Sequence, residues 1–399
     1  MTDENYRINP NRLNYLLDQY KLEVSDLASR LTPSNKKRDV FIQQINDVLN
    51  DKIKVELKFI KKLDTIFEKG LNWYILNTDI KIEPTKSIFF RKPNIAVESD
   101  IIFESKKIVT AFEEKKFELL YLSKLINYNL DRKLNRYTSD KLPINVANEM
   151  VNKFAQFSNI KINKATQNKD RDKAYLEYLI RIIEQYNVFV FEFIEAPNKK
   201  NPVNYNGFLI SPNVIVLKRE KSYRREIFTL LHEFAHYLLD LEAIDDVDIE
   251  DIKTHSEQEK WCNEFAYHFL MHDNLAEFEK LDFTKDNTQL GTIVSEFYKK
   301  TYLSKQAIYT RLKIDHKITL SDYNTAMKAV SDYLEREAAE KKLKNNKNGK
   351  GGFPRQEIKS NLLKDIIKYN YFSGNIDENR AMSYLNIKKA DKFERAIYS

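Results

Sequence analysis

The chain has 399 residues, of which 42% are hydrophobic and 31% charged, and it contains 24 Phe and 23 Tyr. This apolar content excludes a disordered chain, and the low numbers of Gly (7) and Pro (9) exclude collagen-like and turn-dense all-β architectures. The net charge of +7 is small for this length, so it permits contact with nucleic acid without implying it.

Cysteine content and apolar runs bear on the cellular compartment. The single cysteine, Cys262, can form neither an internal disulfide nor a cysteine-rich zinc site. No apolar run approaches the ~20 residues of a membrane-spanning helix, so we expect no membrane contact. The first residues, MTDENYRINPNR, lack the apolar core of a signal peptide. Together these features predict a cytoplasmic protein.

Residues 1–70 are predicted to form a bundle of short helices. Leu13, Leu16 and Leu17 have helical spacing and follow an Asn-Pro pair, which favours the start of a helix. Three more segments with helical spacing follow, at residues 23–31, 40–51 and 57–67. Such a set of short helices suits a helix-turn-helix bundle.

Residues 71–150 are interpreted as a connector. Residues 80–90 have an extended pattern, whereas residues 99–128 have the apolar spacing of one long helix.

Residues 151–320 are predicted to form a domain of helices and strands. Residues 188–194 are rich in β-branched and aromatic side chains, which is typical of a strand. Residues 207–217 are predicted to form a hairpin, because Ser-Pro-Asn interrupts two apolar runs. Helical spacing predicts helices at residues 225–241 and 256–271 and a short helix pair over residues 295–314.

Residues 321–399 are predicted to be a helical region with a flexible loop at residues 341–355, where three of the seven glycines lie. Two helices are expected beyond the loop, at residues 358–372 and 378–387. The fold class predicted for the whole chain is mainly α with a small antiparallel β-sheet (α+β).

A motif with chemical meaning lies in the helix predicted at residues 225–241. His232-Glu233-Phe234-Ala235-His236 is an HExxH sequence, and histidines four residues apart on a helix share one face, so both imidazoles can reach one ion. Zn²⁺ suits neutral imidazole with carboxylate, and Glu233 is placed to accept a proton from the attacking water. Five of the six histidines of the chain cluster in this region: His232, His236, His255, His268 and His272.

A third metal ligand is expected from the following helix, because two histidines and one glutamate form a common catalytic zinc site. The helical pattern leaves three candidates open, namely Glu257, Glu259 and Glu264. Cys262 lies in the same helix and is interpreted as a small buried core residue.

These segments together resemble a known family. IFTLLHEFAHYLL followed by ExxCNEFAYHFLM resembles the ImmA/IrrE metallopeptidases, whose pattern combines FTLAHELGH with an acidic residue, Ala-Asn and Phe-Ala. Asn263, Phe265 and Ala266 match the second part of that pattern. The chain departs from it at Phe234-Ala235, Cys262 and His272, and none of these positions is a ligand or the base.

The resemblance implies a zincin-like peptidase core between a helical N-terminal bundle and a helical C-terminal region. It implies that His232, His236 and Glu259 bind Zn²⁺ and that Glu233 is the catalytic base. The strand near residues 213–217 is expected to align an extended substrate by adding a strand to the sheet.

Residues 8–31 resemble the first two helices of the phage-repressor helix-turn-helix found in longer family members. The family's Trp-x-x-Gly and Pro-Thr turn is absent after the predicted recognition helix, and residues 1–70 carry 13 basic and 11 acidic side chains. The sequence leaves open contact with double-stranded DNA and a structural or partner-binding bundle. The side chains placed to face DNA are Lys36, Lys37, Arg38, Gln43, Gln44 and Asn46.

The resemblance thus implies an endopeptidase that cleaves a regulatory protein of the repressor or antitoxin type, in stress response, mobile-element control or phage defence. The alternatives are a non-proteolytic transcriptional regulator and a toxin–antitoxin component that uses the peptidase-like fold for sensing or binding. A homodimer is compatible with each.

Overall fold

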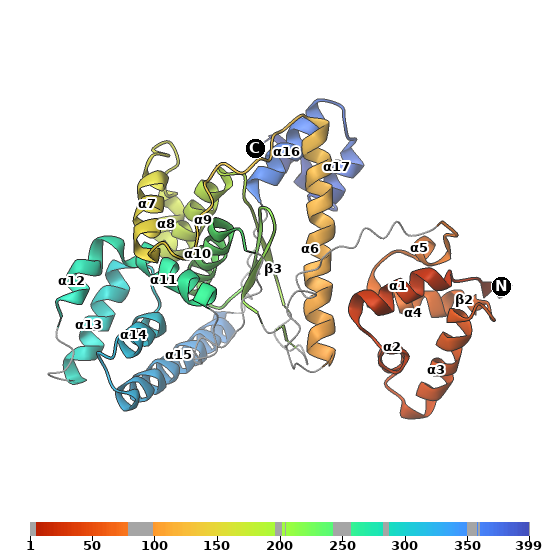
Figure 1. Ribbon diagram of the computed structural model, residues 1–399, viewed down its shortest axis with the longest axis horizontal. Helices are drawn as coiled ribbons and strands as arrows, with labels where there is room; N and C mark the ends of the chain where they lie inside the picture. The colour runs from red at the N-terminus through yellow and green to blue at the C-terminus, as the bar shows by residue number, and fades with distance from the viewer. Residues whose placement is uncertain are drawn as a thin grey trace. The chain divides into compact units, whose positions relative to one another are not determined.

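Helices dominate the computed structural model, which describes residues 5–78, 99–195, 202–203, 205–241, 257–281, 287–348, 357 and 360–398 (Figure 1). Two small sheets accompany the helices, so the predicted mainly α fold with a small β component is confirmed. In the described part of the chain, none of the helices combines the length and the apolar character needed to cross a membrane. The chain divides into a first unit of residues 1–115 with 198–204 and a second unit of residues 116–197 with 205–399.

The first unit contains a bundle of short helices. The elements are β1 (Asn5–Tyr6), α1 (Pro10–Tyr20), α2 (Val24–Leu31), α3 (Asn35–Leu49), β2 (Val55–Glu56), α4 (Leu57–Phe67) and α5 (Leu71–Ile75). Asn9 caps α1 by accepting a hydrogen bond from the Asn11 N–H, and Pro10 occupies the first turn. Leu13, Leu16 and Leu27 are fully buried in the core of the bundle.

Helix α6 (Ser99–Leu125) begins in the first unit, where Phe103 packs against the rings of Tyr20 and Phe67. It covers most of the long helix predicted at residues 99–128. The extended segment predicted at residues 80–90 lies outside the described residues.

The sheet of the second unit has three strands, β3 (Phe189–Phe193), β4 (Gly207–Ile210) and β5 (Val214–Lys218), in the order β3-β5-β4. The antiparallel β4–β5 pair confirms the predicted hairpin. Strand β3 runs parallel to β5, so this sheet is mixed, whereas an antiparallel sheet was predicted. Because β5 is paired on both sides, the strand expected to align a substrate has no free edge.

Helices make up most of the rest of the described second unit. They are α7 (Pro143–Ala155), α8 (Lys164–Lys169), α9 (Arg171–Glu184), α10 (Tyr223–Leu239), α11 (Glu257–Met271), α12 (Leu275–Glu279), α13 (Asn287–Lys300), α14 (Lys305–Ile314), α15 (Leu320–Asn348), α16 (Asn361–Phe372), α17 (Glu378–Tyr384) and α18 (Ala390–Tyr398), with a 3₁₀ turn at His272–Asn274. The flexible loop predicted at residues 341–355 overlaps α15 up to residue 348, and the rest of it lies outside the described residues.

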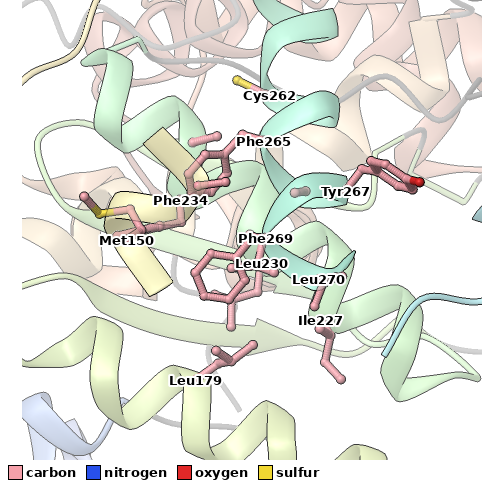
Figure 2. Packing of buried hydrophobic residues seen from close by; sticks show 14 of the residues in the cluster. Met150, Leu179, Ile227, Leu230, Phe234, Cys262, Phe265, Tyr267, Phe269 and Leu270 are labelled. Carbon is pink, nitrogen blue, oxygen red and sulfur yellow. The ribbon is translucent and has the colours of Figure 1, made fainter. Parts of the chain in front are cut away.

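The core of the second unit fixes α10 against α11. Phe234 of α10 lies 6.4 Å, between ring centroids, from Phe265 of α11, and Phe269 packs one turn further along α11 (Figure 2). Met150 of α7 and Leu179 of α9 close this cluster. Burial of each such side chain contributes roughly 1.5–3 kcal/mol, so the two helices form a rigid support for polar residues on their facing sides.

Candidate metal centre

Helix α10 places the HExxH residues inside the protein. His232 and His236 are each 1% exposed and Glu233 is fully buried, although all three are polar. The side chains one turn apart project from one face, as the i, i+4 spacing predicts. Arg132 donates hydrogen bonds to the carbonyl oxygens of Tyr237 and Leu238, and thereby satisfies the C-terminal end of the helix that carries the site.

Glu259, in the first turn of α11, completes a cluster of three possible metal ligands. The His232 and His236 Nε2 atoms are 3.0 Å apart, and Glu259 Oε2 lies 3.2 Å from the first and 3.5 Å from the second. Tetrahedral zinc with bonds of 2.0–2.1 Å separates its ligand atoms by about 3.3 Å. The donor atoms and their spacing therefore fit a zinc ion.

Asn263, one turn beyond Glu259, controls the protonation of His232. Its Oδ1 atom lies 3.0 Å from His232 Nδ1, and an amide oxygen can only accept. His232 therefore donates through Nδ1 and keeps the lone pair of Nε2 for a metal. The corresponding neighbour of His236 Nδ1 is the sulfur of Cys262, at 3.6 Å, and Cys262 is fully buried as predicted.

The site favours a charged Glu259. Burial opposes ionisation of this carboxyl group, but the hydrogen bonds and positive charge that His232 and His236 supply in their protonated form outweigh that effect and hold the pKa of Glu259 well below its usual range. Glu259 is thus an anion without competing protonation, which is the state a metal ligand requires.

The other two glutamates that the sequence left open lie elsewhere. Glu257 is exposed, whereas Glu264 accepts a hydrogen bond from Arg311 of α14 and lies 3.2 Å from His268 Nε2. Burial raises the pKa of Glu264, but His268 and Arg311 outweigh this and lower it to about 2. Among the described residues, only Glu259 joins the two histidines in a possible metal cluster.

The remaining histidines of the sequence cluster do not join the site in the described structure. His268 pairs with Glu264, and His272 lies 2.7 Å from the Asp273 carboxylate. His255 lies outside the described residues. The sequence placed Asn263 on the same face as Glu259 and matched it to the family pattern, but it did not predict the contact with His232, which depends on how α11 packs against α10.

The six residues predicted to face DNA all lie on α3 of the first unit. Lys36, Lys37 and Gln43 are exposed, and the Gln43 amide donates to the Asp47 carboxylate at 3.1 Å. Arg38, Gln44 and Asn46 are partly buried. The exposed lysines stand at the N-terminal end of α3.

Comparison with known proteins identifies a peptidase-like segment. Residues 184–313 match the model of the peptidase M78 family, described as the IrrE N-terminal-like domain. No curated protein and no solved structure matches the chain. The match covers about one third of the chain and includes the three-stranded sheet, α10, α11 and the His232-His236-Glu259 cluster. It supports the resemblance to the ImmA/IrrE family over the segment that holds the candidate site.

Proposed function

We propose that this protein is a zinc-dependent endopeptidase that cleaves a regulatory protein of the repressor or antitoxin type. The observation that carries the proposal is the buried His232-His236-Glu259 cluster, with Glu233 beside it on α10, inside the segment that matches a peptidase family. The family resemblance supports a role for such an activity in stress response, mobile-element control or phage defence.

The chemistry divides between the ion and the side chains. When bound, zinc supplies a Lewis acid that acidifies a water and polarises a peptide carbonyl. His232, His236 and Glu259 hold the ion, and Asn263 keeps His232 in its binding tautomer. Glu233 accepts the proton of the attacking water and passes it to the leaving amine, and its complete burial keeps bulk water from competing for that proton.

The strand suited to align a substrate is β4, because it forms an edge of the described sheet and α10 packs against it. The Lys218 N–H donates to the Asn206 carbonyl, so these two residues form a hydrogen-bonded pair. Hydrogen-bonded and non-hydrogen-bonded pairs alternate from that point along the antiparallel hairpin. The backbone groups of Gly207 and Leu209 consequently point away from β5. An extended peptide could pair with them by β-augmentation.

Metal analysis tests the proposal most directly. We expect about one zinc per chain by elemental analysis, lost in the His232→Ala/His236→Ala variant and retained in Glu233→Gln. The zinc-loaded wild type should cleave members of a proteome-derived peptide library that Glu233→Gln leaves intact. A folded protein that takes up no stoichiometric zinc would refute the peptidase.

Zinc binding without cleavage by the wild type would instead favour the non-proteolytic alternatives, a regulator or a toxin–antitoxin component. In that case Glu233→Gln should preserve the biological phenotype, because binding and sensing need no proton transfer.

We further propose that the first unit contacts double-stranded DNA. The observation in favour is the arrangement of α2, a three-residue turn and α3, in which Lys36 and Lys37 are exposed at the start of the second helix. Phosphate contacts by such lysines would give affinity, and neighbouring side chains on α3 would contact base edges.

A further inference from the structure

Gly207, the first residue of β4, lies directly against the helix that carries the candidate base. A Cβ atom added to Gly207 would stand 2.7 Å from Thr229 Cγ2 and 3.1 Å from both Cγ and Oε1 of Glu233. Thr229 and Glu233 are one turn apart on α10, so they form a single wall facing the glycine.

Position 207 requires glycine because a side chain has no space there, and not because of its backbone conformation. Positive φ angles occur at Gly70 and Gly374 among the described glycines, whereas Gly207 has none and sits in a regular antiparallel pair opposite Leu217. A methyl group here cannot fit unless Thr229 or Glu233 moves. Gly291 of α13 offers the contrast, because nothing lies within 4 Å of a Cβ added there.

We propose that Gly207 is a positioning residue for Glu233: the missing side chain leaves the room in which the Glu233 carboxylate stands beside β4. This inference rests on the proposed function of Glu233 as the base. A base must lie within about 2.6–3.2 Å of the atom that carries the proton it accepts, so a shift of a few tenths of an ångström matters. Glu233 is fully buried, which leaves its carboxylate few alternative positions.

A purely structural role for Gly207 makes a different prediction. The nearest atom to the added Cβ is the Thr229 methyl carbon, so a Gly207→Ala variant could suffer only from poorer packing of β4 on α10. Replacing Thr229 by Ser removes that methyl and leaves the Glu233 contacts. The double variant Gly207→Ala/Thr229→Ser therefore separates packing from positioning.

The test uses the full-length, zinc-loaded protein and acetohydroxamate as the probe, with binding measured by calorimetry. A hydroxamate chelates zinc through two oxygens and shares its N–OH proton with a neighbouring base, so Glu233→Gln sets the scale for loss of that base. Thr229→Ser and Gly291→Ala are the controls, and thermal unfolding and chelator competition for zinc are recorded for every variant.

We expect both variants that carry Gly207→Ala to bind acetohydroxamate at least about tenfold more weakly than the wild type. Their zinc affinity should stay within about threefold of the wild type, because no ligand or ligand neighbour is altered. The two controls should match the wild type in both measurements. The double variant should unfold at a higher temperature than Gly207→Ala alone, but it should not regain affinity for acetohydroxamate.

Three results would overturn the inference. Restored affinity in the double variant, with Glu233→Gln still weak, would assign Gly207 to packing and leave the proposed function intact. Failure of the double variant to fold would assign it to packing as well. If Glu233→Gln bound acetohydroxamate as tightly as the wild type, the role of Glu233 as the base would be refuted. The positioning role of Gly207 and the proposed peptidase would then fail together.

Discussion

At the scale of single residues, the contact between Asn263 and His232 makes a sharp prediction. We expect Asn263→Ala to weaken zinc binding about 10–100-fold, because His232 loses the acceptor that keeps its proton on Nδ1. Asn263→Asp should bind zinc at least as well as the wild type, since a carboxylate accepts the same hydrogen bond. Competition with a chromogenic chelator measures both affinities.

Cys262→Ser is the matched control for that experiment. Its side chain neighbours His236 Nδ1 at 3.6 Å, and a thiol is a weak partner, so this exchange should change zinc affinity much less than Asn263→Ala. Equal zinc affinities for Asn263→Ala and the wild type would show that the hydrogen bond does not control the tautomer.

The sequence predicts part of this site and not the rest. Spacing along one helix places His232 and His236 together, since four residues make about one turn. The same spacing could not identify which of three glutamates of α11 is the third ligand, because that depends on contacts with residues far away in the sequence. Glu264 accepts a hydrogen bond from Arg311, 47 residues away in the sequence, and no local pattern predicts that pairing.

At the scale of elements, Glu184 attaches the C-terminal helices to the peptidase-like segment. This buried carboxylate ends α9 and accepts hydrogen bonds from Ser360 Oγ at 2.6 Å and from the Asn361 N–H at 2.8 Å. The Asn361 side-chain amide donates to its other oxygen. Glu184 therefore binds the first turn of α16, where an anion is favoured by the helix dipole.

A pH dependence follows from this contact. Burial raises the pKa of Glu184 to about 7, even though Ser360 and Asn361 favour its ionised form. The folded state thus binds more protons than the unfolded state between pH ~4.5 and ~7, so Glu184 lowers the stability as the pH rises through that window. The free energy of unfolding falls by roughly 3 kcal/mol in total, and this decrease is complete above pH ~7.

Glu184→Gln isolates this contribution because glutamine does not titrate and the Asn361 amide can turn to accept its N–H. We expect the free energy of unfolding of the wild type, minus that of Glu184→Gln, to fall between pH ~4.5 and ~7 in urea titrations. Glu177→Gln makes the same substitution at a partly exposed position of the same helix and is the matched control. A flat difference for Glu184→Gln would contradict the prediction.

Elements were easier to predict than their pairing. Periodicity revealed α1, which buries one face along its length, and it also revealed α10, although that helix is buried on every side from Thr229 to Leu239. The β4–β5 hairpin was visible from its turn. The parallel pairing of β3 with β5 was not, since the thirteen residues between β3 and β4 carry no signal for where the next strand docks.

At the scale of the whole molecule, the candidate site belongs entirely to the second unit, whereas the predicted DNA-facing residues belong to the first. The boundary between the units falls within α6, after Lys115. Composition gives no signal for a division inside a continuous helix, and the four-part division at residues 70, 150 and 320 stays a prediction.

The first unit makes the last prediction. If α3 contacts DNA, the full-length Lys36→Ala/Lys37→Ala variant should bind a short mixed-sequence duplex more weakly than the wild type. The slope of log affinity against log salt should fall by about 2, because each phosphate contact contributes about 0.9. Fluorescence anisotropy over a series of salt concentrations measures both quantities.

Lys58→Ala/Lys61→Ala provides the matched control, because it removes the same charge from exposed positions on α4. A local contact at α3 predicts that this control keeps a salt slope close to that of the wild type. Equal losses in both double variants would show that only the overall charge of the unit attracts DNA. No binding by the wild type would leave the bundle as a structural or partner-binding module, which its excess of only two basic residues over acidic ones also allows.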